Sequence, residues 1–322
     1  KQQPKKQQPK KQQPKKQQPK KQQPKKTRNS MSNITAQMVK QLRDRTGAGM
    51  MECKKALTEA KGDMDKAVDA MRKAGQAKAD KKSSRVAAEG IIKFVAKNNE
   101  KFNLVEINCE TDFVAKDNNF LDFAELISKS SLDSFNGNLQ DFHQVKQANG
   151  KTIEEIRLEV ISKLGENVQI RRIQQVNIDS GFMGYYMHGN KICVTTILEK
   201  KDDALAKDIC MHIAAMKPLS IDAEGISKDN LEREKEIFKA QANESGKPED
   251  IIEKMIDGKM KKYISEVTLL NQNFVKDNDI TIENLLKKNG NKILSFLRME
   301  VGEGIEKKDE NFAEEVMAQI KK

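Results

Sequence analysis

The stretch "GIIKFVAKNNEKFNLVEINCETDFVAKDNNFLDFAELISKS" (residues 90–130) contains two strand patterns, a turn at "NNEK" and a helix pattern in succession. Within 102–108, Phe102, Leu104 and Ile107 are spaced among polar residues as in a strand. Asp117 to Asn119 are then typical of a helix start and predict a helix in "NNFLDFAELISKS". An antiparallel hairpin covered by a helix is therefore predicted.

Phe113 lies on the short polar connection between the second strand and this helix. An aromatic side chain in such a place either fills the protein's own core or is directed at a partner. The local pattern leaves both interpretations open, because a loop often turns one aromatic inward.

The same order of elements recurs at 182–217, with a strand "FMGYYM", a turn "HGN", a strand "KICVTTILEK" and a helix "DDALAKDICMHIAAMKP". In the first unit a further helix, "TIEEIRLEVISKLG", and a strand, "NVQIRRIQQVNI", follow. Two such units predict a duplicated α+β core of antiparallel hairpins, each covered by helix. No obvious residue-level repeat accompanies the repeated order.

Helical segments flank and interrupt this core. Residues 34–75 predict three short helices in a minimal bundle, with Thr35 and Asp63 as N-caps. Met50 and Met51 lie at a turn, where they either fill the small core or form an adaptable contact surface. Residues 228–270 predict an antiparallel helical hairpin joined at "SGKP". The apolar seam of its second arm is Ile252, Ile256, Met260, Tyr263, Val267 and Leu270.

The predicted fold class is thus α+β and multidomain. After the hairpin, the helix "TIENLLKKNG" and the strand "KILSFLRMEV" return to the core, and a short helix ends the chain. The expected division is a disordered Lys/Gln/Pro leader (1–30), a three-helix domain (31–84), a first core subdomain (85–180), a second core subdomain (181–227 and 269–303), the inserted hairpin (228–268) and a C-terminal module (304–322).

The basic charge is concentrated at one end. The chain has 59 Lys and Arg against 48 Asp and Glu, but residues 1–30 contain 11 Lys and one Arg and no acidic residue. Subtraction leaves 59 − 12 = 47 basic against 48 acidic residues, so the remainder is nearly neutral. The five KQQPK copies of residues 1–25 suggest an appended leader. Nucleic-acid binding is expected only weakly, through these lysines.

Signatures of covalent chemistry are missing from the sequence. The four cysteines form no C-x-x-C pair, and the three histidines show no metal-ligand spacing. "NGKT" at 149–152 is not the end of a phosphate loop, because Val145 occupies the position that requires glycine. We therefore expect a binding protein with no cofactor, no metal and no enzymatic activity. Without a long apolar run or a signal peptide, a cytoplasmic protein is expected.

Six segments resemble the bacterial translation elongation factor Ts family, in family order from about Ile34 to the C-terminus. The resemblance does not include the KQQPK tract. The segments are "ITAQMVKQLRDRTGAGMMECKKALTEAKGDMDKAVDAMRKAG", "NCETDFVAKDNNF", "KLGENVQIRRI", "MHIAAMKP", "SGKPEDIIEKMIDGKMKKY" and "FLRMEVGEGIEKK".

The resemblance implies a guanine-nucleotide exchange factor for elongation factor Tu, with a ubiquitin-associated-like N-terminal bundle and a hairpin that dimerises some relatives. It implies that the T-D-F-V loop enters the nucleotide-binding domain of Tu and disturbs its Mg²⁺ site, which makes Phe113 a probe directed at the partner. The residues that match family contacts are Thr111, Asp112, Phe113 and Val114 in this loop, Arg43, Met50 and Met51 in the bundle, and His188 and His212 in the second core subdomain.

Two other functions are compatible with the same features. One is a chaperone or assembly subunit that stabilises Tu through the methionine surface and the hairpin. The other is an RNA-binding protein that acts through the lysine tract, although this tract has no aromatic residue for base stacking.

Overall fold

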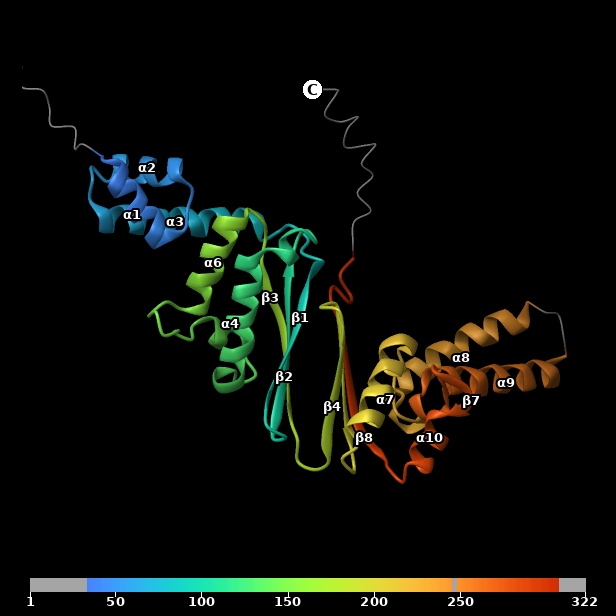
Figure 1. Cartoon of the computed structure of the whole chain (residues 1–322). Coiled ribbons are helices and arrows are strands. Elements are labelled where there is room, and N and C mark those ends of the chain that lie inside the picture. Colours follow the sequence, from blue (N-terminus) through green and yellow to red (C-terminus); the bar gives the residue numbers. More distant parts are fainter. Residues whose placement is uncertain (1–33, 245–247, 307–322) are drawn as a thin grey trace, which may run out of the picture.

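Two three-stranded antiparallel sheets form the centre of the molecule (Figure 1). The computed structural model describes residues 34–244 and 248–306. Each sheet consists of a hairpin and a third strand that pairs with the second strand of the hairpin, which confirms the predicted hairpins. The strands are β1 (Glu89–Lys97), β2 (Lys101–Cys109) and β3 (Gln169–Asn177) in the first sheet, and β4 (Phe182–His188), β5 (Ile192–Leu198) and β8 (Ile293–Glu300) in the second.

The central strand β2 is buried on both faces. Val105 and Ile107 belong to the apolar cluster beneath the helices, whereas Phe102 and Leu104 belong to a cluster between the two sheets. This division follows from the period of two in a strand, because successive side chains point to opposite faces. The second sheet therefore covers the face of β2 that the helices leave open.

Helices cover the outer faces of the sheets, so that the core has helix, sheet, sheet and helix layers (Figure 1). On the first sheet lie α4 (Asn118–Ser134) and α6 (Ile153–Leu164), with the short α5 (Leu139–His143) between them in sequence, and α7 (Asp203–Met216) lies on the second. Asp117 caps α4 by accepting from the Asn119 N–H at 2.7 Å. Between the layers the rings of Phe94 and Tyr185 stack with centroids 4.1 Å apart.

The two units share one order of elements, and the second contains an insertion. In each, a hairpin is followed by helix and then by the third strand of the sheet. The insertion lies between α7 and α10 (Ile282–Lys288) and comprises the helical hairpin and a small β-hairpin, β6 (Asn273–Phe274) and β7 (Asp277–Thr281). The two ends of its helical-hairpin part meet, because Ser220 and Thr268 form a parallel bridge and the Leu219 N–H donates to the Val267 carbonyl at 2.8 Å.

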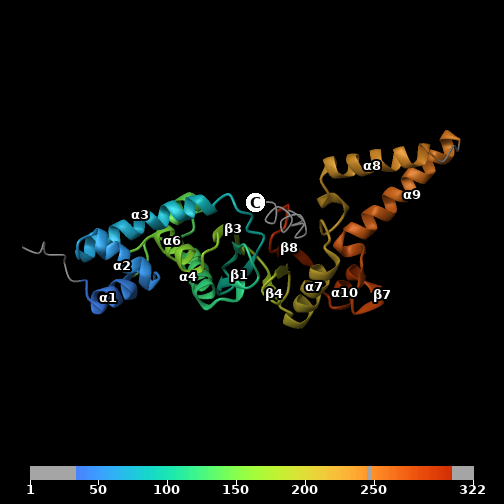
Figure 2. The same ribbon diagram turned by 90° about the horizontal axis from the view of Figure 1, so that it is seen from above.

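The predicted helical hairpin is confirmed as α8 (Lys228–Asn243) and α9 (Glu249–Val267), which project from the body opposite the N-terminal bundle (Figures 1 and 2). Ile256 is buried between the arms, and Phe238 meets Tyr263 edge to face with centroids 6.3 Å apart. The prediction was wrong for Leu270, which lies beyond the end of α9 in the 3-10 turn η3 (Leu269–Asn271) and packs on the second core. Most of the "SGKP" connection lies outside the described residues.

The N-terminal bundle consists of α1 (Ala36–Thr46), α2 (Met50–Glu59) and α3 (Met64–Lys82), as predicted. The Thr35 hydroxyl accepts from the Met38 N–H at 3.2 Å, and Asp63 accepts from the Lys66 N–H at 3.1 Å, so both predicted caps are confirmed. α3 continues beyond residue 75 and lies alongside α6 (Figure 2). The predicted leader (1–30) and the terminal helix within 304–322 lie outside the described residues, apart from 304–306.

A buried carboxylate ties the last strand of the second sheet to the first sheet. Glu106 on β2 is 0% exposed, and it accepts hydrogen bonds from Arg171 at 2.9 Å, Arg172 at 2.5 Å and the Gly302 N–H at 2.8 Å. Burial alone would raise the pKa of Glu106, but these hydrogen bonds outweigh burial and lower it. The carboxylate is therefore held ionised between the two sheets.

Candidate functional site

Phe113 lies on the turn that joins β2 to α4, and the residue is 80% exposed. The turn continues into the 3-10 helix η1 (Val114–Lys116), in which Ala115 is buried and Val114 packs against the first core. Neighbouring residues of the turn thus point in opposite directions, with Val114 and Ala115 inward and Phe113 outward. The core-filling interpretation of Phe113 does not hold.

The turn is held by hydrogen bonds to Thr111. Its hydroxyl accepts from the Val114 N–H at 3.4 Å, and its carbonyl accepts from the Ala115 N–H at 3.3 Å and from the Cys109 thiol at 3.1 Å. Asp112 is exposed, and the Lys116 ammonium beside it at 2.8 Å lowers the pKa of that carboxyl. Phe113 is therefore presented by a closed turn flanked by an ionised carboxylate.

The candidate residues of the bundle lie together at the junction of α1 and α2. Arg43 is exposed near the end of α1, and Met50 and Met51 at the start of α2 are 60% and 77% exposed. Gly47 makes the sharp turn between the helices in a left-handed conformation, with φ 67°. The small bundle core is closed by other residues, so these two methionine side chains face outward.

The two candidate histidines have different environments. His188 is exposed at the end of β4, 3.1 Å from the Tyr186 hydroxyl. His212 is 0% exposed; its Nδ1 accepts from the Val275 N–H at 3.2 Å, and its Nε2 lies 3.0 Å from the Gln272 side-chain oxygen. Burial lowers the pKa of His212. His212 thus holds the small β-hairpin onto α7, and the expectation that it meets a partner is corrected: a residue inside the core presents no surface.

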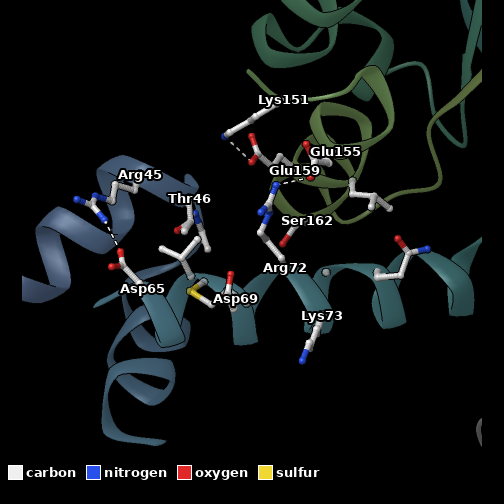
Figure 3. A pocket seen from close by; sticks show the side chains of 16 residues that line it. Arg45, Thr46, Asp65, Asp69, Arg72, Lys73, Lys151, Glu155, Glu159 and Ser162 are labelled. Carbon is white, nitrogen blue, oxygen red and sulfur yellow. Dashed lines mark hydrogen bonds and ion pairs between the residues drawn. The ribbon is translucent and has the colours of Figure 1, made fainter. Parts of the chain in front are cut away.

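A pocket of about 890 Å³ lies between the bundle and α6 (Figure 3). Six of its charged side chains form ion pairs: Arg72 reaches across from α3 to Glu155, Lys151 lies 2.5 Å from Glu159, and Arg45 lies 3.3 Å from Asp65. The pocket lining contains neither histidine nor cysteine. Of these pairs, Arg72 with Glu155 joins the bundle to the core, whereas the other two lie within the core and within the bundle.

Within residues 34–244 and 248–306, no group of three or more His, Cys, Asp or Glu side chains is placed to hold a metal ion. All four cysteines are buried, and burial raises the pKa of the Cys109, Cys193 and Cys210 thiols to about 12. Within the same ranges no helix has the length and apolar character needed to cross a bilayer.

Comparison with known proteins gives one consistent result. The model of the family "Elongation factor TS" matches residues 110–303. Elongation factor Ts of Legionella pneumophila strain Lens is 51% identical over 292 residues, which are 90% of this chain and 100% of the relative. The proteins of that name from Thioalkalivibrio sulfidiphilus and Francisella tularensis subsp. novicida are 53% and 52% identical over 89% and 90% of this chain, and over 99% and 100% of their own. The chain belongs to the elongation factor Ts family.

Proposed function

We propose that this chain is a guanine-nucleotide exchange factor that binds elongation factor Tu with GDP and promotes release of the nucleotide during translation elongation. The observation that carries the proposal is the exposed ring of Phe113 on a hydrogen-bonded turn. An exposed aromatic on a held turn has the form of a rigid wedge, which loses little conformational entropy when it enters a partner.

In the proposed mechanism, Thr111, Asp112, Phe113 and Val114 form the segment that enters the nucleotide-binding domain of Tu. Mg²⁺ on a GTPase helps to neutralise the phosphates of the nucleotide and demands near-ideal octahedral geometry. A wedge that displaces its ligands by an ångström or so therefore weakens the grip on GDP. Asp112 is suited to accept hydrogen bonds from donors on Tu, because it is exposed and ionised. No covalent step is required, so the factor is not an enzyme in this proposal.

The remaining surfaces are assigned to partner contacts. We place Arg43, Met50 and Met51 of the ubiquitin-associated-like bundle against the nucleotide domain of Tu, and His188 against another domain of Tu. Exposed methionines suit such a contact, because their flexible, polarisable side chains adapt to a partner surface. The domain division at 31–84, 85–180, 181–227 with 269–303, 228–268 and 304–322, and a cytoplasmic location, belong to the same proposal.

The function is tested by the release of labelled GDP from purified elongation factor Tu. Substoichiometric amounts of this chain are expected to accelerate release in the presence of excess unlabelled GDP, because an exchange factor is regenerated when incoming nucleotide displaces it. An unchanged release rate at saturating concentrations of the chain would exclude the exchange function. The same assay on an unrelated GTPase is the specificity control.

We also propose that the helical hairpin is a contact surface between two copies of the chain. Ile237 on α8 and Ile251 on α9 are exposed apolar side chains on this projecting element. Sedimentation over a range of protein concentrations is expected to show dimers, which should dissociate in an Ile237→Ser, Ile251→Ser double variant. A monomer at all concentrations would contradict this assignment and leave the exchange function untouched.

A further inference from the structure

A pair of carboxylates closes the base of the Phe113 turn. Glu166, just after α6, accepts hydrogen bonds from the Glu110 N–H at 3.1 Å, the Thr111 N–H at 3.0 Å and the Thr111 hydroxyl at 2.6 Å. Glu110 accepts in return from the Asn167 N–H at 2.6 Å. Each carboxylate thus accepts hydrogen bonds from backbone N–H groups of the segment that carries the other carboxylate. These N–H groups need such acceptors because β2 ends at Cys109, and the strand pairing that satisfies backbone groups ends with it.

We propose that Glu166 is a positioning residue for exchange: it fixes the direction in which the turn presents Phe113. The proposal rests on the exchange function proposed above. Thr111 donates two of the three hydrogen bonds that Glu166 accepts, and the Thr111 hydroxyl and carbonyl also accept from the N–H groups of residues 114 and 115. Glu166 therefore fixes Thr111, and Thr111 fixes the turn that carries Phe113.

Glu166 is itself fixed by its neighbours. Gly165 ends α6 in a left-handed conformation with φ 79°, which turns the chain toward β2. Asn167 is buried, and its side-chain amide donates to the Arg85 carbonyl at 2.9 Å and the Ser83 carbonyl at 3.5 Å. Residues 83–85 follow α3 directly and connect the N-terminal bundle to the core. Asn167 therefore forms hydrogen bonds both with this connection and with Glu110 at the base of the Phe113 turn.

The contacts of Glu166 favour positioning over general stabilisation. In the described part of the chain, all hydrogen bonds found for its carboxylate come from Glu110 and Thr111. Glu154 provides a matched contrast in the same subdomain: it accepts from Arg157 and lies 2.7 Å from His143. Among the described residues, its hydrogen bonds and ion pairs are to Arg157 and His143 and not to the turn. Hydrogen bonds from Arg157 and His143 outweigh burial and lower the pKa of Glu154 to about 2.

The test uses the full chain with Glu166→Ala, and Glu154→Ala as the matched control. Loss of charge-assisted hydrogen bonds at the base of the turn is expected to slow GDP release from Tu about 10-fold in Glu166→Ala. Glu154→Ala should lower the unfolding midpoint and keep the wild-type release rate. Hydrogen exchange of the Thr111 and Ala115 amides should accelerate in Glu166→Ala only, because their protection depends on the clamped turn.

A double-mutant cycle separates positioning from a second, independent effect. If Glu166 acts through the turn, Phe113→Ala with Glu166→Ala should be no slower than Phe113→Ala alone. Additive losses, a full release rate in Glu166→Ala, or unchanged amide exchange would each overturn the proposal. A wild-type chain without exchange activity would instead overturn the proposed function, while the amide exchange still reports on its own whether Glu166 holds the turn.

Discussion

Replacing Phe113 with Ala should slow GDP release from elongation factor Tu by about 10- to 100-fold, since full burial of a large apolar side chain against a partner contributes about 1.5–3 kcal/mol. The stability of the chain itself should change by less than about 0.5 kcal/mol, as is usual for surface positions. The reason is the placement of Phe113, which is 80% exposed and belongs to no core cluster of the described chain. Stopped-flow release of a fluorescent GDP analogue, together with thermal unfolding of both proteins, measures the two effects.

Val275→Ala is the matched control for Phe113→Ala. Val275 is another exposed apolar side chain, between β6 and β7, and its removal should leave release unchanged. Equal losses of fold and activity in Phe113→Ala would contradict the probe interpretation. A Phe113→Ala protein that still protects nucleotide-free Tu against heat would show that a chaperone-like role is separable from exchange.

The largest effect on stability is expected at Glu106. Glu106→Gln removes the buried counter-charge of Arg171 and Arg172. Breaking a fully buried ion pair costs about 3–5 kcal/mol, and the cost here should lie toward or below the lower end, because both guanidinium groups are partly exposed and Arg172 keeps its pair with Glu303. The matched substitution Glu125→Gln removes an exposed carboxylate that pairs with Lys93 and Lys129, and should cost less than about 1 kcal/mol. Denaturant midpoints of the two variants at neutral pH give the comparison; a Glu106→Gln protein as stable as Glu125→Gln would contradict the assigned role.

The same carboxylate predicts the direction of acid sensitivity. Folding lowers the pKa of Glu106 below its ordinary value of 4.5, so its contribution to stability is complete above that value and is lost as the pH falls toward the pKa of the folded state. The difference in midpoint between wild type and Glu106→Gln should therefore shrink as the pH is lowered below about 4.5. A difference that grows in acid would show that another group is responsible.

Local sequence patterns predicted the long elements well, because periodicity and capping are local properties. They missed β6 and β7, since strands of this length carry too few residues for a period to be recognised. That omission also explains why the burial of His212 was not predicted: without the small β-hairpin, nothing indicated what would cover this side chain. The pairing of the two sheets was likewise not predicted, because it depends on contacts between residues far apart in the chain.

The candidate site was predicted in part. The residues of the turn were found through resemblance, whereas the outward direction of Phe113 follows from the inward packing of Val114 and Ala115, which no local period specifies. Glu166 was missed because it lies 55 residues from Thr111 in sequence and belongs to no motif of covalent chemistry. Only folding brings α6 and the end of β2 together.

The meeting of the two ends of the helical hairpin has a further consequence. The chain leaves the second core after Leu219 and returns at Thr268, and backbone hydrogen bonds from Leu269 to Ser220 and from Leu270 to Ile221 close the gap at 2.9 and 3.0 Å. The segment between Leu219 and Thr268 is therefore attached to the second core at one place, where its two ends lie side by side. Evolution can lengthen, shorten or exchange such an appendage without interrupting a strand, because closing a longer loop at a fixed base adds little entropic cost.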